Sequence, residues 1–375
     1  MKNIIKNILG VIGVVLFVGS QYTYSQKLFY PSSKDSSKTF SIGAYLDVYS
    51  SVSNTNFGSN VFPYFVSSNR LNEVQLNLGF IDLRYTSNRF RAKLAPGLGT
   101  YMQSNYAPEP NYAKNIVEGY LGWKILKSKN YWLDIGVFSS PYTNESAISR
   151  DHYMYTRSIA PEYVPYYIAG LKATVPIRST LTLYGYVLNG WQQIKDQNNS
   201  KSFTLQMEYK PTTSHLVNWD LYVGNEVSSA SPNLRNRYFS DLYWYYTPQN
   251  ARFHFVTCVY AGIQERLEAT VKKQLSTWWQ ANFVLKYILN SKQNLAARIE
   301  YFSDPSLVQL QSMVHATDEM NLGSTGLCWN YSMNKYILLR GDARYYFSPS
   351  AVFPTSNGSP LNSTFQFTGN MTFTF

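Results

Sequence analysis

The chain has 375 residues, of which 17% are aromatic and only 15% are charged, and its formal net charge at pH 7 is +11. A soluble domain usually carries charge on about a quarter of its residues. Beyond residue 25, no apolar run reaches the roughly 20 residues that a membrane-spanning helix needs. The composition therefore argues against an ordinary soluble domain and excludes a helical membrane protein.

The N-terminus has the pattern of a secretory signal peptide. Lys2 and Lys6 precede an apolar run from Ile8 to Val18, and small residues follow it. This pattern predicts export with cleavage near Ser25/Gln26. No cysteine lies near that position, so a lipid anchor is not expected.

After the signal peptide, apolar and polar residues alternate in segment after segment. Strict alternation predicts strands with two unlike faces. In chain order the predicted strands are 39–50, 73–85, 88–99, 115–127, 130–138, 166–175, 180–189, 201–210, 216–226, 236–247, 250–263, 276–290, 293–303, 317–331, 334–347 and 363–375. The apolar phase slips by one residue around Ile81 and Asp82, which predicts a β-bulge there.

The connections between these strands alternate in length. Tight turns such as Ser87-Asn88, Arg178-Ser179 and Met333-Asn334 alternate with long stretches such as 51–72 and 139–165. Short periplasmic turns and long extracellular loops are typical of outer-membrane barrels. The sequence therefore predicts an all-β fold, a transmembrane antiparallel up-and-down barrel of about sixteen strands. The predicted domains are the signal peptide (1–25), a periplasmic tail (26–38) and the barrel (39–375).

The last strand shows which face meets lipid. Its apolar side chains share one face and its polar side chains share the other. The apolar set is Phe365, Phe367, Met371, Phe373 and Phe375, and the polar set is Thr364, Gln366, Thr368, Asn370, Thr372 and Thr374. The first set suits lipid and the second a polar lumen. The terminal Phe373 and Phe375 also resemble the membrane-insertion signal of bacterial outer-membrane barrels.

A barrel of this size leaves an aqueous channel unless something fills it. The longest loop, 139–165, combines four tyrosines, followed directly by Tyr166 and Tyr167, with ionisable groups that could select solutes by charge and hydrogen bonding if it folds inward. Its candidate constriction residues are Glu145, Arg150, Asp151, Arg157 and Glu162, with His152 beside them. The alternative is an external loop packed over the barrel rim.

Charges of both signs nearly balance on the predicted lumen face. Arg298 and Glu300 are two positions apart in one predicted strand, so they share a face. Arg340, Asp342 and Arg344 share a face of another predicted strand in the same way. Such neighbours can line a pore or form ion-pair ladders that brace the wall, and bracing is the expected role for most of them. The net charge therefore does not by itself predict an anion channel, and the dispersed basic residues argue against nucleic-acid binding.

Catalytic and metal motifs are absent from the sequence. The four histidines lie in different segments without ligand spacing, and no HExxH or paired-cysteine motif occurs. We expect neither an enzyme nor a cofactor. Cys258 and Cys328 fall about three strands apart, too far for a disulfide, so free thiols are predicted.

Two stretches carry a resemblance to a known family. Residues 155–170, YTRSIAPEYVPYYIAG, and residues 181–192, LTLYGYVLNGWQ, resemble the OmpL-like β-barrel porin family of Bacteroidetes-type bacteria. The resemblance covers most of the mature chain and implies a porin-like barrel in the outer membrane, without supplying a verified site.

Two functions are open at this point. The first is a porin for passive diffusion of small hydrophilic solutes or ions, with loop 139–165 as the constriction. The second is a non-conducting barrel that serves as a structural or partner-binding component of a larger envelope complex. Expected partners are outer-membrane lipid and lipopolysaccharide, the barrel assembly machinery, and further copies or complex subunits.

Overall fold

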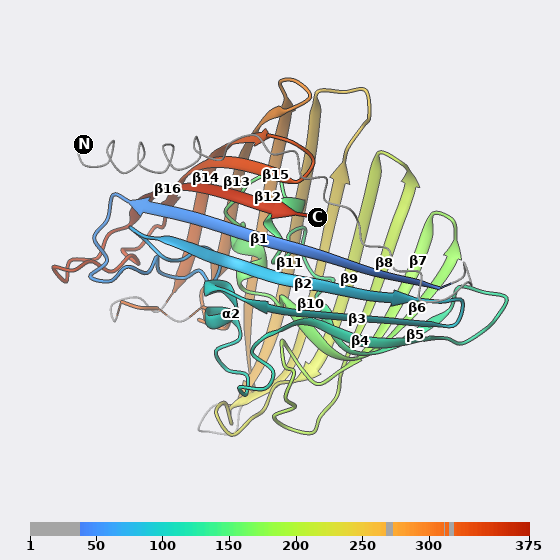
Figure 1. Ribbon diagram of the computed structural model, residues 1–375. Coiled ribbons are helices and arrows are strands. Elements are labelled where there is room, and N and C mark those ends of the chain that lie inside the picture. Colours follow the sequence, from blue (N-terminus) through green and yellow to red (C-terminus); the bar gives the residue numbers. More distant parts are fainter. Residues whose placement is uncertain (1–37, 268–272, 311, 315–318) are drawn as a thin grey trace.

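The alternating segments form sixteen antiparallel strands in the described part of the chain, and these strands close into a barrel (Figure 1). The computed structural model describes residues 38–267, 273–310, 312–314 and 319–375, so the predicted signal peptide and nearly all of the predicted tail lie outside it. The strands are β1 (Thr39–Ser53), β2 (Val74–Thr86), β3 (Phe90–Leu98), β4 (Ile116–Lys124), β5 (Trp132–Ser139), β6 (Tyr167–Arg178), β7 (Leu181–Leu188), β8 (Ser202–Thr212), β9 (His215–Asn225), β10 (Leu234–Tyr246), β11 (Phe253–Leu267), β12 (Lys273–Ile288), β13 (Gln293–Asp304), β14 (Met320–Ser332), β15 (Ile337–Phe347) and β16 (Ser363–Thr374). The predicted fold class is confirmed.

The barrel closes where the first strand meets the last. β1 and β16 pair in antiparallel register, with Val48 opposite Met371, and every other strand pairs with its neighbours in sequence. Each predicted strand overlaps one observed strand. The short turns lie at one end of the barrel, where β1 also begins and β16 ends. The long loops lie at the other end.

The strands have the two faces that the alternation predicts. Leu46 and Phe365 point outward and are 44% and 39% exposed, whereas Asp47 and Thr368 point inward and are fully buried. A barrel with apolar residues outside and polar residues inside suits a membrane.

The predicted bulge lies elsewhere on β2. Ile81 and Asp82 pair regularly with Ala44 and Gly43, and the register with β1 shifts instead between Leu78 and Leu76. The extra residue, Asn77, turns its side chain inward and donates to Asp47 Oδ2 at 2.9 Å. The prediction at 81–82 was therefore wrong, because a buried polar contact and not the apolar phase places the bulge.

Among the residues that the structure describes, helical structure is confined to the long loops. The helices are α2 (Thr100–Asn105), the 3-10 helix η1 (Ser149–Asp151) and α3 (Ile159–Glu162). In the described ranges, no helix is long and apolar enough to cross a membrane.

The largest apolar cluster lies inside the barrel towards the long-loop end. Phe62, Tyr163 and Phe353, from three different loops, pack there against wall residues such as Trp278 and Phe302. Tyr163 stacks on Phe302 with ring centroids 4.8 Å apart. The loops therefore fold into the lumen and fill much of it near the long-loop end.

Candidate functional site

The longest loop enters the lumen. We call residues 140–166, between β5 and β6, the inserted segment; Figure 1 shows it in green within the barrel. Near its start, the backbone N–H of Thr143 donates to Asp241 Oδ2 on β10 at 2.8 Å, and Asn144 donates to Asn282 Oδ1 on β12 at 2.9 Å. The segment thus crosses from the wall where it originates to strands on the far side.

The segment also reaches the short-turn end of the barrel. The guanidinium of Arg150 donates to the carbonyl oxygens of Tyr336 at 3.0 Å and Lys335 at 2.7 Å, in the turn between β14 and β15. Asp151 lies next to it and is exposed. Because the segment starts among the long loops, it runs nearly the whole height of the lumen.

A buried charge network on β13 and β15 holds the middle of the segment. Glu300 pairs with Arg344 and lies 3.1 Å from the Nε of Arg298, and its other oxygen accepts the N–H of Ile159 at 2.6 Å. Arg298 donates to the Thr156 carbonyl at 2.7 Å, and Arg344 donates to the Arg157 carbonyl at 2.7 Å. These three side chains are almost fully buried.

The remaining members of the predicted ladders bind the segment too. Asp342 Oδ2 accepts the N–H groups of Tyr155 and Thr156, both at 2.9 Å. Arg340 donates to the Ser149 carbonyl at 2.6 Å. The expectation that these charges mainly brace the wall was therefore incomplete. Only Arg298, Arg344 and Glu300 pair within the wall, and all five side chains contact the segment.

Two charged groups of the segment itself, Arg157 and Glu145, are buried. Arg157 donates to the carbonyls of Ser146 and Ala147 and lies 3.9 Å from Asp47. Glu145 accepts the Ser158 N–H at 2.5 Å. Burial raises the pKa of the Glu145 carboxyl, and the charge of Arg298 opposes that rise.

Two further ionisable residues of the segment accept backbone N–H groups. Glu162 accepts the Val66 N–H at 2.7 Å and so joins the segment to loop 54–73. His152 Nε2 accepts the Ser146 N–H at 2.8 Å. Burial lowers the pKa of His152 well below its usual range, so the ring is neutral.

Some charged side chains on the opposite wall of the lumen keep partial contact with solvent. On β3 to β8, Arg91 pairs with Asp134 and Lys93 pairs with Glu118, and these basic side chains keep contact with solvent. The ammonium of Lys172 lies 5.1 Å from the ring centroid of Tyr184. This wall therefore presents accessible charges of both signs to the lumen.

The structure also shows a buried acidic pair that the sequence did not single out. Asp220 on β9 and Asp241 on β10 are directly opposite each other in register and almost fully buried. Their Oδ1 atoms have no hydrogen-bond partner among the described residues. Asp220 Oδ2 accepts from Asn218, and Asp241 Oδ2 accepts from the inserted segment. Two buried carboxylates side by side cannot both be ionised cheaply, so we infer that one proton lies between them.

This inference predicts that Asp220→Asn is tolerated. The new amide can donate to Asp241 in place of the shared proton, so the free energy of unfolding should change by less than about 1 kcal/mol or rise. Asp342→Asn should instead destabilise the barrel by roughly 1–3 kcal/mol, because the carboxylate accepts from the segment backbone. The two variants are compared by urea unfolding in lipid vesicles, and a loss of several kcal/mol in Asp220→Asn would contradict the shared proton.

Both cysteines are buried free thiols, as predicted. Cys258 lies on β11 and Cys328 on β14. Within the described residues, no group of three or more His, Cys, Asp and Glu side chains could hold a metal ion.

Comparison with known proteins places the fold among porins. The anion-selective porin of Comamonas acidovorans has a TM-score of 0.59 at 8% identity, and the match covers 90% of this chain and 100% of that one. OmpF of Salmonella typhi, in complex with daunomycin, has a TM-score of 0.60 at 12% identity, with 90% and 98% covered. The outer membrane channel DcaP of Acinetobacter baumannii has a TM-score of 0.58 at 8% identity, with 92% and 99% covered. At these identities the likeness shows the fold alone.

Sequence comparison is more specific about the family. A search of curated proteins finds no match. Residues 39–375, the whole predicted barrel, match the model of the family described as beta-barrel porin-2, OmpL-like. Together, the porin-like fold and the match over nearly the entire chain show that this protein belongs to the OmpL-like family of outer-membrane β-barrel porins.

Proposed function

We propose that the barrel is a diffusion channel for small hydrophilic solutes or ions, narrowed by the inserted segment. The main support is that the two sides of the lumen differ in how their charged side chains are used. Charged residues on β13 and β15 bind the segment backbone, whereas the wall of β3 to β8 keeps solvent-accessible charges. The candidate constriction residues Glu145, Arg150, Asp151, Arg157 and Glu162 all lie on the segment. A solute would pass between the segment and the wall of β3 to β8.

The charges along this wall favour no single sign. Arg91 faces Asp134, Lys93 faces Glu118, and Glu208 lies on β8 beyond Lys172. Opposed charges set up a local field that water and small polar solutes can cross, while larger or apolar molecules are excluded. We therefore expect weak ion selectivity despite the basic composition.

A second candidate is a non-conducting barrel that acts as a structural or partner-binding subunit. The apolar cluster formed by loops and wall at the long-loop end favours it. A small internal space of about 10 Å³ beside Arg157 and Arg344 has room for roughly one water molecule. In this case the closed lumen would be permanent and the outer loops would carry the function.

Conductance in planar bilayers separates the two candidates. The refolded mature protein should give stable single-channel steps, with a reversal potential near zero under a salt gradient. Deleting residues 145–160 should enlarge the steps severalfold, because the contacts to β13 and β15 are lost. A folded barrel that stays silent both with and without these residues would favour the structural role.

We place this activity in the bacterial outer membrane, after removal of the predicted signal peptide near Ser25/Gln26. The C-terminal Phe373 and Phe375 would be recognised by the barrel assembly machinery. Surrounding lipid, lipopolysaccharide and other copies or complex subunits remain the proposed partners.

A further inference from the structure

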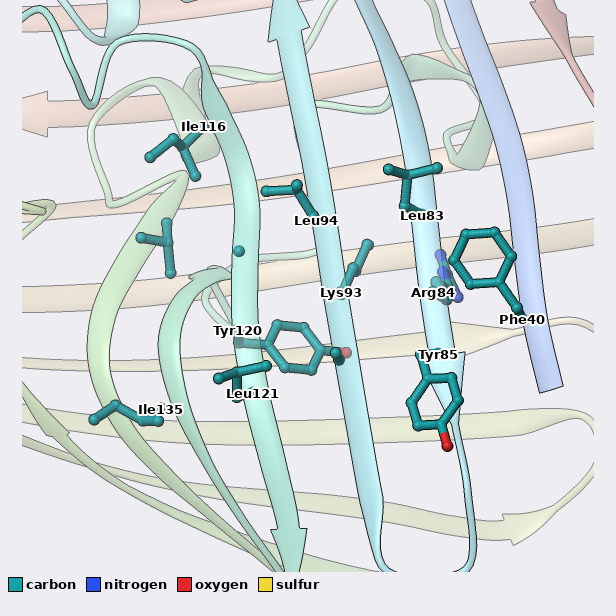
Figure 2. Close-up of a pocket in the computed structure, with 13 residues that line it drawn as sticks. Phe40, Leu83, Arg84, Tyr85, Lys93, Leu94, Ile116, Tyr120, Leu121 and Ile135 are labelled. Atoms are coloured by element: carbon teal, nitrogen blue, oxygen red, sulfur yellow. The ribbon is translucent and has the colours of Figure 1, made fainter. Parts of the chain in front are cut away.

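The outer surface of the barrel carries an apolar groove of about 520 Å³ across β1 to β5 (Figure 2). Two rows of cross-strand neighbours form most of it, and Arg84, Lys93, Ile116 and Tyr120 complete its lining. The first row is Phe40, Tyr85, Ala92, Leu121 and Ile135, and the second is Leu83, Leu94, Gly119 and Val137. Leu94, Leu121 and Ile135 are each more than half exposed, so the groove opens away from the lumen.

Two small residues create the hollow. Ala92 and Gly119 occupy the middle of rows in which most other positions carry large apolar side chains. A Cβ built on Gly119 would meet only Ile116 Cγ2 at 3.4 Å and Leu94 Cδ1 at 3.9 Å, which are ordinary contacts. Larger side chains could therefore fill the groove without strain in the wall.

Three exposed cations stand at the short-turn end of this groove. Arg89 lies in the turn between β2 and β3, and Lys127 and Lys129 lie between β4 and β5. The backbone N–H of Lys124 donates to the Arg89 carbonyl at 2.9 Å and joins the two turns. Neither turn contains Asp or Glu. The cations therefore have no acidic neighbour within their own turns.

We propose that this groove binds one anionic glycerophospholipid from the periplasmic leaflet of the membrane. An acyl chain lies over Ala92 and Gly119, and the phosphate lies between Arg89, Lys127 and Lys129. Apolar surface and basic residues then meet the two chemically different parts of one ligand. The inference rests on the outer-membrane location of the barrel and not on conduction.

The length of the wall supports this geometry. β3, β4 and β5 contain 9, 9 and 8 residues, whereas β11 and β12 contain 15 and 16. A spanning strand needs about 9–11 residues. The short wall brings the basic turns to the level of the headgroups, within reach of a phosphate.

A second copy of the chain fits the groove less well. A two-fold contact places the same surface of both copies together. It would bring Arg89, Lys127 and Lys129 towards the identical cations of the partner, with no acidic residue in those turns to offset them. Charge complementarity therefore favours a lipid.

Native mass spectrometry of the refolded mature barrel tests the proposal. The protein is titrated in detergent micelles with phosphatidylglycerol or with phosphatidylcholine, which differ in net charge. Because each basic residue is worth roughly fivefold in binding to an anionic lipid, we expect phosphatidylglycerol to bind at least about tenfold more tightly. Replacing Arg89, Lys127 and Lys129 with Gln should abolish that preference.

Filling the groove tests the acyl-chain contact separately. Ala92→Phe, or Gly119→Ile as a second filler, should weaken binding of both lipids at least about fivefold. Ala261→Phe, at an exposed outward position on β11, should weaken binding of neither lipid. The pair Lys210→Gln, near the end of β8, and Lys292→Gln, in the turn between β12 and β13, should leave the preference for phosphatidylglycerol unchanged. Equal affinity for the two lipids, or unchanged binding in the filled and neutralised variants, would overturn the proposal. So would a dimer that Ala92→Phe disrupts in the absence of bound lipid.

Discussion

Replacing both Arg298 and Arg344 with alanine should release the inserted segment and open the lumen. The two guanidinium groups hold the carbonyls of Thr156 and Arg157 and neutralise Glu300, and all of these contacts are buried. Removing the cations leaves the Glu300 carboxylate without its ion-pair partners, which typically costs about 3–5 kcal/mol. We expect a drop of this size in the free energy of unfolding, together with a severalfold rise in single-channel conductance.

A third substitution separates stability from opening. Adding Glu300→Gln removes the carboxylate that has lost its ion-pair partners. The triple variant should therefore regain much of the lost stability while the channel stays enlarged. Arg84→Ala is the control, because Arg84 is exposed and its pair with Asp82 is worth about 1 kcal/mol or less. A folded triple variant with unchanged conductance would show that these arginines do not hold the segment.

Gly170→Ala should prevent normal folding of the wall beside the segment. Gly170 has φ of 153°, and a Cβ built there would lie 2.0 Å from the Val187 carbonyl oxygen. Its cross-strand neighbour Gly136 has φ of 144° and an equally close contact with the Gly119 carbonyl. No side chain can occupy either position unless the backbone moves. The variant should lose most of the heat-resistant, fast-migrating barrel on unboiled SDS gels.

Gly185→Ala and Gly369→Ala are matched controls for this effect. A Cβ at either position would meet no atom within 4 Å, and neither glycine has positive φ. Both variants should fold with wild-type yield. Wild-type yield from Gly170→Ala as well would mean that β5 and β6 pair differently from the arrangement described above.

The alternation of side chains predicted the strands well because it is a local property. Each strand places lipid-facing and lumen-facing residues at every second position, so Leu46, Phe365 and Phe203 could be assigned outward from the sequence alone. The lengths of the connections are also local, and they predicted that short turns lie at one end of the barrel and long loops at the other. The family resemblance in residues 155–170 pointed to the fold but not to the contacts.

The interior could not be predicted in the same way, because its contacts join distant parts of the chain. Asn77 forms the bulge through a hydrogen bond to Asp47, 30 residues away. Asp220 and Asp241 meet only because two strands have a particular register. Alternation could place Asp342 in the lumen, but not show that it accepts backbone N–H groups of Tyr155, 187 residues earlier. Such partners depend on tertiary packing, which one sequence does not reveal.

A cross-link between Arg150 and Lys335 tests whether the inserted segment runs through the lumen. Arg150 and Lys335 are both replaced by Cys, and a short bismaleimide is added to the folded protein in membranes. Because Arg150 contacts the turn at the short-turn end, we expect an intramolecular cross-link between 150 and 335, identified by mass spectrometry of the tryptic peptides.

The native thiols are buried and should react slowly. The pair Tyr112→Cys and Lys335→Cys, with Tyr112 exposed in a long loop, should give none. Efficient labelling of both positions 150 and 335 without any cross-link would contradict a segment that runs through the lumen.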